Sequence, residues 1–370
     1  MRFNLIKMED ALESLIDYRG KTPKKSETGI MTLSAKSVKN NHIDYSQCYF
    51  ISEEEYKRFM VRGIPKKGDI LLTTEAPLGC VARLNRDDVA IAQRLLTLRG
   101  KKQVLDNDYL LYYLQSPIGQ ASLKARESGT TVTGIKQSEF KKIELMIPDY
   151  EAQRCISSIL RTIDKKIELN NAINNNLEQQ AIAIFDNMFP NISDAEKTIG
   201  DIIIPKRGKN LLSKNAILGN VPVVAGGLNP STYHNTANTV APVLSISASG
   251  ANAGYVNLWN IPIWSSDSSF IDSSMSNDVY FWYVLLKKRQ NEIYDSQTGS
   301  AQPHIYPQHI AAMPICDLNF NKVSNYTSTV TPIFELIGHN KIENMRLITI
   351  RDALVPKLIS GDLDVSNISL

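Results

Sequence analysis

The hydrophobic residues between about 153 and 189 are spaced as in a long helix with one apolar stripe. They recur at alternating intervals of four and three, and the positions between them are mostly Lys, Glu, Asn, Gln and Asp. This spacing is the seven-residue repeat of a coiled coil, whose stripe packs against a partner helix. The predicted seam consists of Ile156, Leu160, Ile163, Ile167, Asn170, Asn174, Leu177, Ala181, Ile184 and Met188.

A second stripe with the same spacing lies 170 residues further along the chain and indicates an internal repeat. Both stripes carry Asn at the same two consecutive seam positions. Such an Asn fixes register and orientation, because a misaligned pairing would bury an unpaired amide. We predict that the two helices pair in antiparallel orientation, the alternative being that each packs on its own domain. The second seam comprises Tyr326, Val330, Ile333, Ile337, Asn340, Asn344, Leu347, Arg351, Leu354 and Leu358.

The segment before the first long helix combines short strand patterns, bounded by Gly and Pro, with few helical patterns. We predict a short helix from Glu9 to Ile16 and a longer one from Asp108 to about Ala125. The predicted strands are Gly29–Leu33, Tyr49–Ile51, Asp69–Thr74, Cys80–Leu84 and Val89–Ala92. This mixture is typical of a domain built on irregular β-sheet.

The segment between the two long helices repeats this plan with different amino acids. Arg207-Gly208-Lys209 matches Arg19-Gly20-Lys21, and the strand pattern at Val243–Ser247 matches the one that begins at Ile70. We therefore predict an α+β protein with two domains of irregular β-sheet and short helices, separated by two long helices in an antiparallel coiled coil. The predicted boundaries are 1–150 and 191–322 for the domains and 151–190 and 323–370 for the helices.

Composition narrows the class of protein. Hydrophobic residues make up 43% and charged residues 21% of the chain, which excludes global disorder. The formal net charge of +3 is compatible with nucleic-acid binding but is too small to indicate it. The four cysteines lack metal-ligand spacing, the N-terminus is not a signal peptide, and no apolar run reaches 18 residues. We expect a cytoplasmic protein with reduced thiols and no bound metal.

The sequence lacks the motifs of a nucleotide-modifying or DNA-cleaving enzyme. It contains neither a Walker-type loop nor the Asn-Pro-Pro-aromatic motif of amino-methyltransferases, and its histidines lack ligand spacing. Asp69 and Glu75 resemble a nuclease carboxylate pair, but Pro77 stands where the accompanying Lys belongs. The glycine-rich segment 249–254 is predicted as a β-turn, because a strand pattern follows it. We predict no catalytic residues and no cofactor.

Sequence segments at the helix ends carry a resemblance to a known family. Ile147–Gln153 leads into the first long helix and Arg351–Gly361 closes the second, while Thr73–Gly79 and Gly299–Ile305 look like recognition-domain segments. With the doubled order of domain and helix, they resemble the DNA-specificity subunit of type I restriction-modification systems. The resemblance implies a non-catalytic protein whose two domains each bind half of an asymmetric, split DNA target. It also implies two methyltransferase subunits docked on the helices, with motor-endonuclease subunits joining through them.

The predicted helix length fits a spacer between two DNA-binding domains. A helix of this length spans roughly 50 Å at about 1.5 Å per residue. A turn of B-DNA advances about 34–36 Å, so the two domains would reach one face of the duplex about one turn or more apart. Two alternatives remain: a coiled-coil scaffold with two carbohydrate- or protein-binding heads and no DNA role, and a stand-alone nuclease.

Cations in predicted loops and at strand edges are suited to DNA phosphate contacts, although an ordinary solvated surface residue is an equal alternative for each. These cations are Lys21, Lys24, Lys25, Lys66, Lys67, Arg126 and Lys136 in the first domain, and Lys206, Arg207, Lys209, Lys214 and Arg289 in the second. Base reading requires polar side chains at a groove edge. The candidates of suitable type are Arg19, Arg94, Lys136, Gln137, Gln297, Gln302 and His304.

Overall fold

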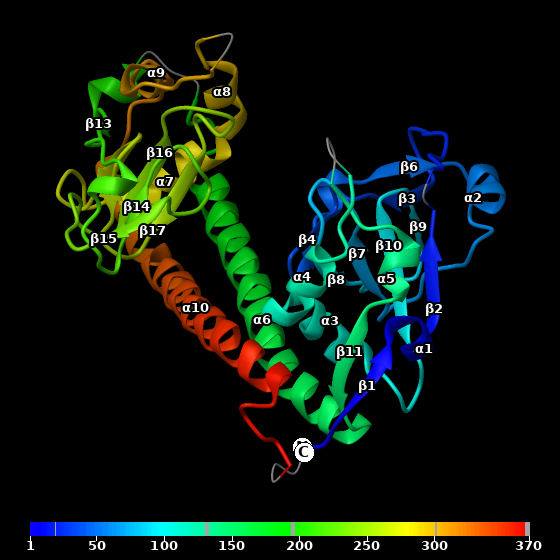
Figure 1. Ribbon diagram of the computed structural model, residues 1–370. Coiled ribbons are helices and arrows are strands. Elements are labelled where there is room, and N and C mark those ends of the chain that lie inside the picture. The colour runs from blue at the N-terminus through cyan, green and yellow to red at the C-terminus, as the bar shows by residue number, and fades with distance from the viewer. Residues whose placement is uncertain (19, 130–132, 194–196, 300–301, 367–370) are drawn as a thin grey trace. The chain divides into compact units, whose positions relative to one another are not determined.

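The computed structural model describes residues 1–18, 20–129, 133–193, 197–299 and 302–366 (Figure 1). The chain divides into two compact units. Unit 1 comprises residues 1–167 and 346–370, and unit 2 comprises residues 168–345. Each unit contains one β-rich domain together with parts of both long helices.

The two long helices are α6, Tyr150–Met188, and α10, Phe320–Ser360. Asp149 caps the start of α6 by accepting from the Ala152 backbone N–H at 2.9 Å. After the last residue of α10, Gly361 adopts a φ of 84°, the left-handed conformation that commonly terminates helices. The observed bounds are therefore 150–188 and 320–360, against the predicted 151–190 and 323–370, so the second helix ends earlier than its predicted boundary.

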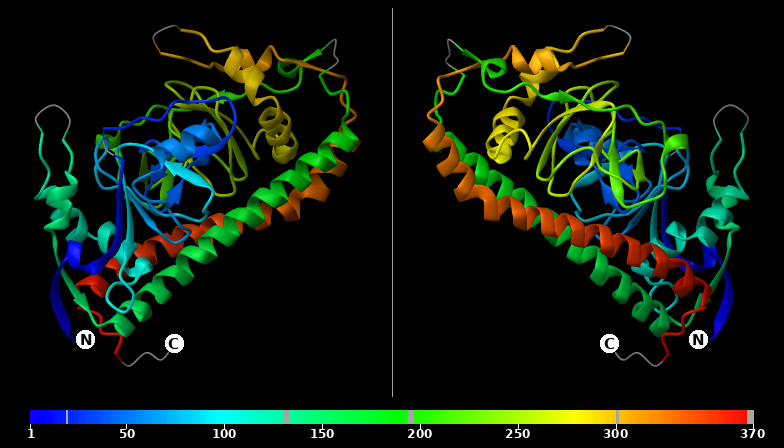
Figure 2. Two further views of the ribbon diagram at one scale, coloured as in Figure 1. Left: turned by 90° about the vertical axis from the view of Figure 1, so that its right-hand side faces the viewer. Right: turned by 90° about the vertical axis from the view of Figure 1, so that its left-hand side faces the viewer.

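The helices α6 and α10 lie side by side and run in opposite directions (Figures 1 and 2). Asn170 pairs with Asn344, whereas the later Asn174 pairs with the earlier Asn340. Pairing in which one number rises as the other falls requires antiparallel helices. The predicted antiparallel coiled coil is confirmed.

The domain of unit 1 is built on a four-stranded antiparallel sheet and a three-stranded sheet. The four strands lie in the order β2 (Leu12–Asp17), β10 (Leu95–Gly100), β7 (Ile70–Thr73) and β8 (Val81–Arg83). The three lie in the order β6 (Tyr49–Ile51), β3 (Ile30–Leu33) and β9 (Val89–Ile91). The remaining elements are β1 (Phe3–Lys7), α1 (Met8–Ala11), β4 (Val38–Lys39), β5 (His42–Ile43), α2 (Glu53–Phe59), α3 (Asn107–Gln115), α4 (Pro117–Lys124), α5 (Gln137–Lys141) and β11 (Glu144–Pro148).

The domain of unit 2 repeats this topology. Its four-stranded sheet has the order β13 (Lys206–Arg207), β19 (Ser268–Asp272), β16 (Val243–Ser247) and β17 (Val256–Trp259). Its three-stranded sheet has the order β15 (Thr232–His234), β14 (Val221–Val224) and β18 (Trp264–Ser265). The other elements are β12 (Lys197–Thr198), α7 (Val279–Lys288), α8 (Gln290–Asp295), α9 (Pro307–Ala311) and β20 (Pro314–Ile315). In both three-stranded sheets one pair is parallel, β3 with β9 and β14 with β18, so even this irregularity is repeated.

The hydrophobic core of each domain is continuous with the long helices in its own unit. In unit 1, Leu160 of α6 and Leu358 of α10 are fully buried in the cluster that contains helix α3. In unit 2, Phe185 of α6 contacts Phe281 of α7 and Tyr326 of α10, with ring centroids 5.5 and 5.4 Å apart. Each domain is therefore fastened to the helix pair by a shared core.

Two local predictions were wrong, and one helix was missed. Residues 12–17 form strand β2 and not the second half of a helix, because they pair with β10 and bury Ile16 in the core. The helix predicted from Asp108 divides at Ser116, whose side chain caps α4. Helix α2 was not predicted at all. Among the described residues, no helix is apolar over a length that would span a membrane.

Candidate nucleic-acid interface

In unit 1, three segments that are distant in sequence meet where the central sheet ends. Thr74, just after β7, donates its backbone N–H to the carbonyl of Arg94, just before β10, at 3.0 Å. The Thr74 carbonyl accepts from the Ile135 N–H at 3.0 Å, and Gly134 forms bridges with Glu75 and Ser128. We call this place, formed by residues 74–75, 94 and 134–136, the sheet end of unit 1.

Unit 2 has the same arrangement. Ala248, just after β16, donates to the carbonyl of Asp267 at 3.1 Å and accepts from the Ile305 N–H at 2.9 Å. His304 forms bridges with Ser249 and Thr298. Residues 248–249, 267 and 304–306 therefore form the sheet end of unit 2, which corresponds to that of unit 1 bond for bond.

Each sheet end holds an arginine against a carboxylate. In unit 1, Nε of Arg94 lies 2.6 Å from Oε1 of Glu75. In unit 2, Nη2 of Arg207 lies 2.5 Å from Oδ1 of Asp267, and Oδ2 of the same carboxylate accepts from the Ser249 hydroxyl. Arg94 and Arg207 are 50% and 41% exposed, so both guanidinium groups reach solvent at the edge of the sheet.

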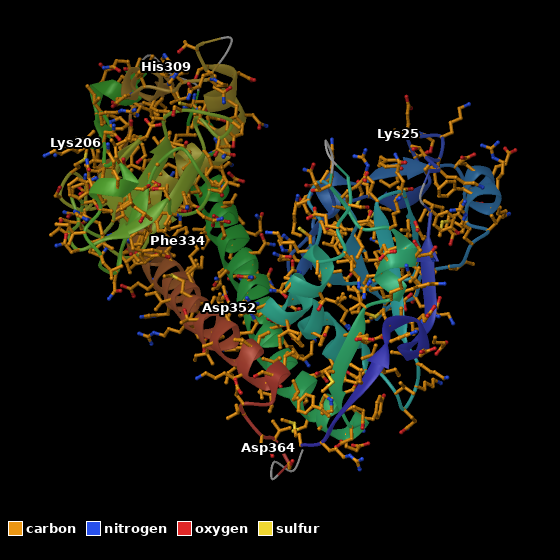
Figure 3. The ribbon with its side chains drawn as sticks, in the orientation of Figure 1. Lys25, Lys206, His309, Phe334, Asp352 and Asp364 are labelled. Carbon is orange, nitrogen blue, oxygen red and sulfur yellow. The ribbon has the colours of Figure 1, made fainter. Side chains whose placement is uncertain are left out.

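The other predicted cations of unit 1 do not all gather at the sheet end. Lys136 directly follows Ile135 there, whereas Lys66 and Lys67 lie at the opposite end of β7, in the turn that enters the strand. The exposed lysines of the loop after β2 are Lys21, Lys24 and Lys25, the last with its ammonium 4.9 Å from the centre of the Tyr49 ring (Figure 3).

Two further candidates of unit 1 are half-buried. Arg126 is paired with Glu139 at 3.4 Å, and Gln137, half-buried, begins α5. Arg19 lies outside the described residues.

In unit 2, Lys206 and Lys209 flank Arg207 and are exposed, as is Lys214 in the following turn (Figure 3). Gln302 is also exposed. His304 is half-buried and stacks on Tyr306, with ring centroids 6.0 Å apart.

Two predicted contacts of unit 2 serve the fold instead. Arg289 is only 5% exposed; its guanidinium pairs with Glu292 at 2.6 Å and donates to the Pro314 carbonyl at 2.6 Å. Gln297 donates to the Ala253 carbonyl at 2.8 Å and holds the turn before β17. Arg289 is therefore corrected from an exposed phosphate contact to a structural residue.

The two carboxylates that resembled a nuclease pair are separated by the length of β7. Asp69 is 1% exposed and accepts from both Nε and Nη2 of Arg99 at 2.7 Å, while Glu75 pairs with Arg94 at the other end. Each carboxylate is thus neutralised by its own arginine. In the described ranges, no group of three or more His, Cys, Asp or Glu side chains could hold a metal ion.

The Asn residues of the seam form two equivalent hydrogen bonds at its centre. Asn170 Nδ2 donates to Asn344 Oδ1 at 2.8 Å, and Asn340 Nδ2 donates to Asn174 Oδ1 at 2.8 Å. The internal repeat exchanges the two bonds, because Asn340 lies 170 residues after Asn170 and Asn174 lies 170 residues before Asn344. The seam residues Ile156, Leu160 and Ile337 are buried, and those half-buried are Ile163, Ile167, Leu177, Ile184, Ile333, Leu347 and Leu354.

A buried polar contact in unit 1 joins both helices to the domain. Asp164 of α6 accepts from the Tyr112 hydroxyl at 2.6 Å and pairs with Arg351 of α10 at 2.8 Å. Burial and the neighbouring Asp164 carboxylate raise the pKa of Tyr112 far above its ordinary value. Tyr112 therefore remains a neutral donor at physiological pH.

Comparison with known proteins gives one consistent family. Residues 9–179 match the family model described as type I restriction modification DNA specificity domain. A type I restriction enzyme specificity subunit from Methanocaldococcus jannaschii is 28% identical over 359 residues, covering 86% of this chain and 82% of the relative. A putative type I specificity subunit from Mycoplasma pneumoniae is 23% identical, with 69% and 72% covered.

A solved structure shares the fold. The crystal structure of a type I restriction-modification system S subunit from M. genitalium aligns over 97% of this chain and 96% of that one, with a TM-score of 0.60 and 20% sequence identity. The likeness extends across both β-rich domains and both long helices.

Proposed function

The chain belongs to the family of type I restriction-modification DNA-specificity subunits, and from this premise we propose that it reads a two-part DNA sequence for partner methyltransferase subunits. It is a non-catalytic member of its complex, in which methylation and cleavage are carried out by other subunits. The observation that carries the proposal is the duplicated sheet end: each domain presents a partly exposed, carboxylate-held arginine at the same place in the same topology.

The target of such a protein is asymmetric. The two sheet ends share their backbone hydrogen bonds but differ in the side chains that they present, with Lys136 next to one and His304 and Tyr306 in the other. Equivalent frames with different side chains read different bases. Residues 1–150 and 191–322 are the two target-recognition domains, each reading one half of the target.

The exposed lysines supply the affinity that is independent of sequence. Lys21, Lys24 and Lys25 in unit 1 and Lys206, Lys209 and Lys214 in unit 2 are exposed and lie on loops or short edge elements. Six to ten phosphate contacts lower DNA affinity by about 10³–10⁵-fold between 50 and 200 mM salt. Steep salt dependence is therefore expected, and its absence favours the scaffold alternative.

The long helices, 151–190 and 323–370, separate the recognition domains and dock two methyltransferase subunits, through which motor-endonuclease subunits join. Support comes from apolar side chains on the outer surface of the helices. Leu169, Ile173 and Leu336 in unit 2 are 50%, 45% and 46% exposed, and Ile350 in unit 1 is 50% exposed. Leu169 and Ile173, four residues apart on α6, are neighbours on the helix surface, and contiguous exposed apolar side chains mark surfaces for protein partners.

The test is to coexpress the chain with its methyltransferase partner in a host that lacks DNA methylation and to sequence the genome for modified bases. The proposal predicts one motif made of two specific parts and an unread gap of constant length. A stable copurifying complex that leaves the genome unmethylated, or that methylates a continuous motif, contradicts the proposal.

A further inference from the structure

The two sheet ends have equivalent backbones, but the positively and negatively charged residues of their ion pairs occupy different positions on them. The matching hydrogen bonds make Arg94 equivalent to Asp267, and Glu75 equivalent to Ser249. The residue directly before β10 in unit 1 is therefore a cation, Arg94, whereas the residue directly before the equivalent strand β19 in unit 2 is a carboxylate, Asp267. In unit 2 the cation is supplied by Arg207, from the outer strand β13.

The charges are exchanged in the opposite sense on the outer strands, β2 in unit 1 and β13 in unit 2. Asp17 at the end of β2 pairs with Leu96, the second residue of β10, and Arg207 at the end of β13 pairs with Ser269, the second residue of β19. Asp17 and Arg207 are therefore equivalent. Both domains place an arginine at the sheet end, but the side chain approaches from a different strand in each.

We infer that Arg94 and Arg207 read a guanine, one in each half of the target, and that Glu75 and Asp267 are positioning residues that hold them. This inference rests on the proposed function and names the residues and the base through which it operates. Bidentate contact from Arg to O6 and N7 of guanine is the commonest base-specific contact in the major groove.

The geometry of the pairs suits this role. Nε of Arg94 lies 2.6 Å from Oε1 of Glu75, and Nη2 of Arg207 lies 2.5 Å from Oδ1 of Asp267. A guanidinium carries five N–H donors, and both side chains are partly exposed, so each arginine can donate to a base edge while its carboxylate holds it. The carboxylates, 23% and 34% exposed, are less exposed than the arginines that they hold. An arginine fixed before binding loses less side-chain freedom when DNA arrives.

The backbone at Arg94 provides a second, independent observation. Its φ is 71°, in the left-handed region that a residue with a long side chain rarely adopts. Such a conformation costs free energy and persists where the surrounding structure imposes it, often at functional sites. Exposed ion pairs contribute little to stability. Stability therefore does not account for an arginine held in a strained conformation at the edge of the sheet.

The experiment uses the full chain in complex with its methyltransferase partner, in the methylation-free host, with modified-base sequencing of the genome. The variants are Arg94→Gln, Arg94→Lys and Glu75→Gln in one domain, and Arg207→Gln and Asp267→Asn in the other. The matched controls are Arg58→Gln, which changes an exposed arginine paired with Glu55 on helix α2, and Lys197→Gln, which changes a lysine paired with Asp317. Thermal unfolding of each complex checks that the variant is folded.

We expect Arg94→Gln to relax one base position in one half-site, with methylation of the mismatched sites rising by about 5- to 150-fold relative to the wild-type complex. Arg207→Gln relaxes one position in the other half-site only. Arg94→Lys relaxes the same position as Arg94→Gln, because a lysine cannot form the bidentate contact. Glu75→Gln and Asp267→Asn relax these positions partially, and the controls keep the wild-type motif.

Phosphate contact gives a different result and overturns the inference. In that case Arg94→Lys behaves as wild type, and Arg94→Gln lowers methylation evenly at all sites and reduces the salt slope of DNA binding by about one. Unchanged motifs in all variants overturn it equally. A wild-type complex that yields no two-part motif contradicts the proposed function itself, which separates that failure from the failure of this inference.

Discussion

Truncating the central amide of the helix pair, Asn170→Ala, is expected to destabilise unit 2. Asn170 is 1% exposed and donates to Asn344 at 2.8 Å and to Glu343 at 2.7 Å. Its removal leaves the amide oxygen of Asn344, itself 7% exposed, without its donor. A buried acceptor without a partner costs about 1–3 kcal/mol, and the lost bond to a partly hydrated carboxylate adds about 1 kcal/mol. The expected loss is about 2–4 kcal/mol.

The double variant Asn170→Leu/Asn344→Leu separates this account from a simple packing effect. Replacing both partners with apolar groups can be nearly neutral. We therefore expect the double variant to recover most of the stability that the matching single variants Asn170→Leu and Asn344→Leu lose, with a coupling energy of about 2 kcal/mol. Asn176→Ala on the exposed face of α6 is the control, expected within about 0.5 kcal/mol of wild type.

Urea unfolding followed by circular dichroism measures the free energies. Hydrogen exchange of peptides from 168–178 assigns the effect to the helix pair, because the two units need not unfold together. A loss below about 0.5 kcal/mol for Asn170→Ala, or strictly additive single and double variants, would refute the role of the Asn pair in alignment.

Three other predictions concern particular side chains. Burial raises the pKa of Tyr280, on α7, to about 12. The unfolded tyrosine titrates near 10, so the folded state holds the phenolic proton more tightly, and the stability that this gives below pH 10 is lost as the pH rises toward 12. Tyr280→Phe should flatten this loss in alkaline unfolding curves, and an unchanged curve contradicts the assignment. Arg289→Gln should lower stability by about 2–3 kcal/mol, because the hydrogen bonds of the buried Arg289 guanidinium to the Pro314 carbonyl and to Glu292 are lost, and should leave the methylated motif unchanged; a relaxed motif in a stable variant would restore Arg289 as a DNA contact. Asp164→Ala should cost about 2–3 kcal/mol, since it leaves the Tyr112 hydroxyl without its acceptor and the half-buried Arg351 guanidinium with only the exposed Asp352 as partner, whereas Asp164→Asn should cost less; equal thermal unfolding of both variants contradicts this explanation.

The helix pair was predictable because its information is local and periodic. A seven-residue stripe of Ile and Leu marks a helix wherever it occurs, and the two Asn layers, repeated at a constant interval, carry the alignment as well. Strands at Tyr49–Ile51 and Ile70–Thr73 were also found, because β-branched and aromatic runs are bounded there by turn residues.

The wrong element predictions share a physical cause. Residues Leu12, Leu15 and Ile16 satisfy a helical pattern as well as a strand pattern, and only their pairing with β10, some 80 residues away, decides for the strand. Tertiary contacts of this kind leave no trace in a local window. Helix α2 was missed for a related reason, since its seven residues are too few to show a helical period.

The interface was harder to predict than the fold. Exposed lysines could be picked out as cations in loops, but burial of Arg289 depends on a carbonyl and a carboxylate that the fold brings to it. The partnership of Arg207 with Asp267 joins residues 60 positions apart, and the sequence match of Arg207 with Arg19 concealed its true equivalent, Asp17. Only the register of the strands makes that correspondence visible.

Exchange of one recognition domain tests the central claim most directly. Residues 1–150 would be replaced by the corresponding domain of a relative that has a different target, with residues 151–370 kept, and the methylated motif of the coexpressed complex would be determined. The account predicts a new sequence in one half-site, with the other half-site and the gap unchanged. A motif that changes in both halves, or that does not change at all, would contradict a protein in which each domain reads its own half of the target.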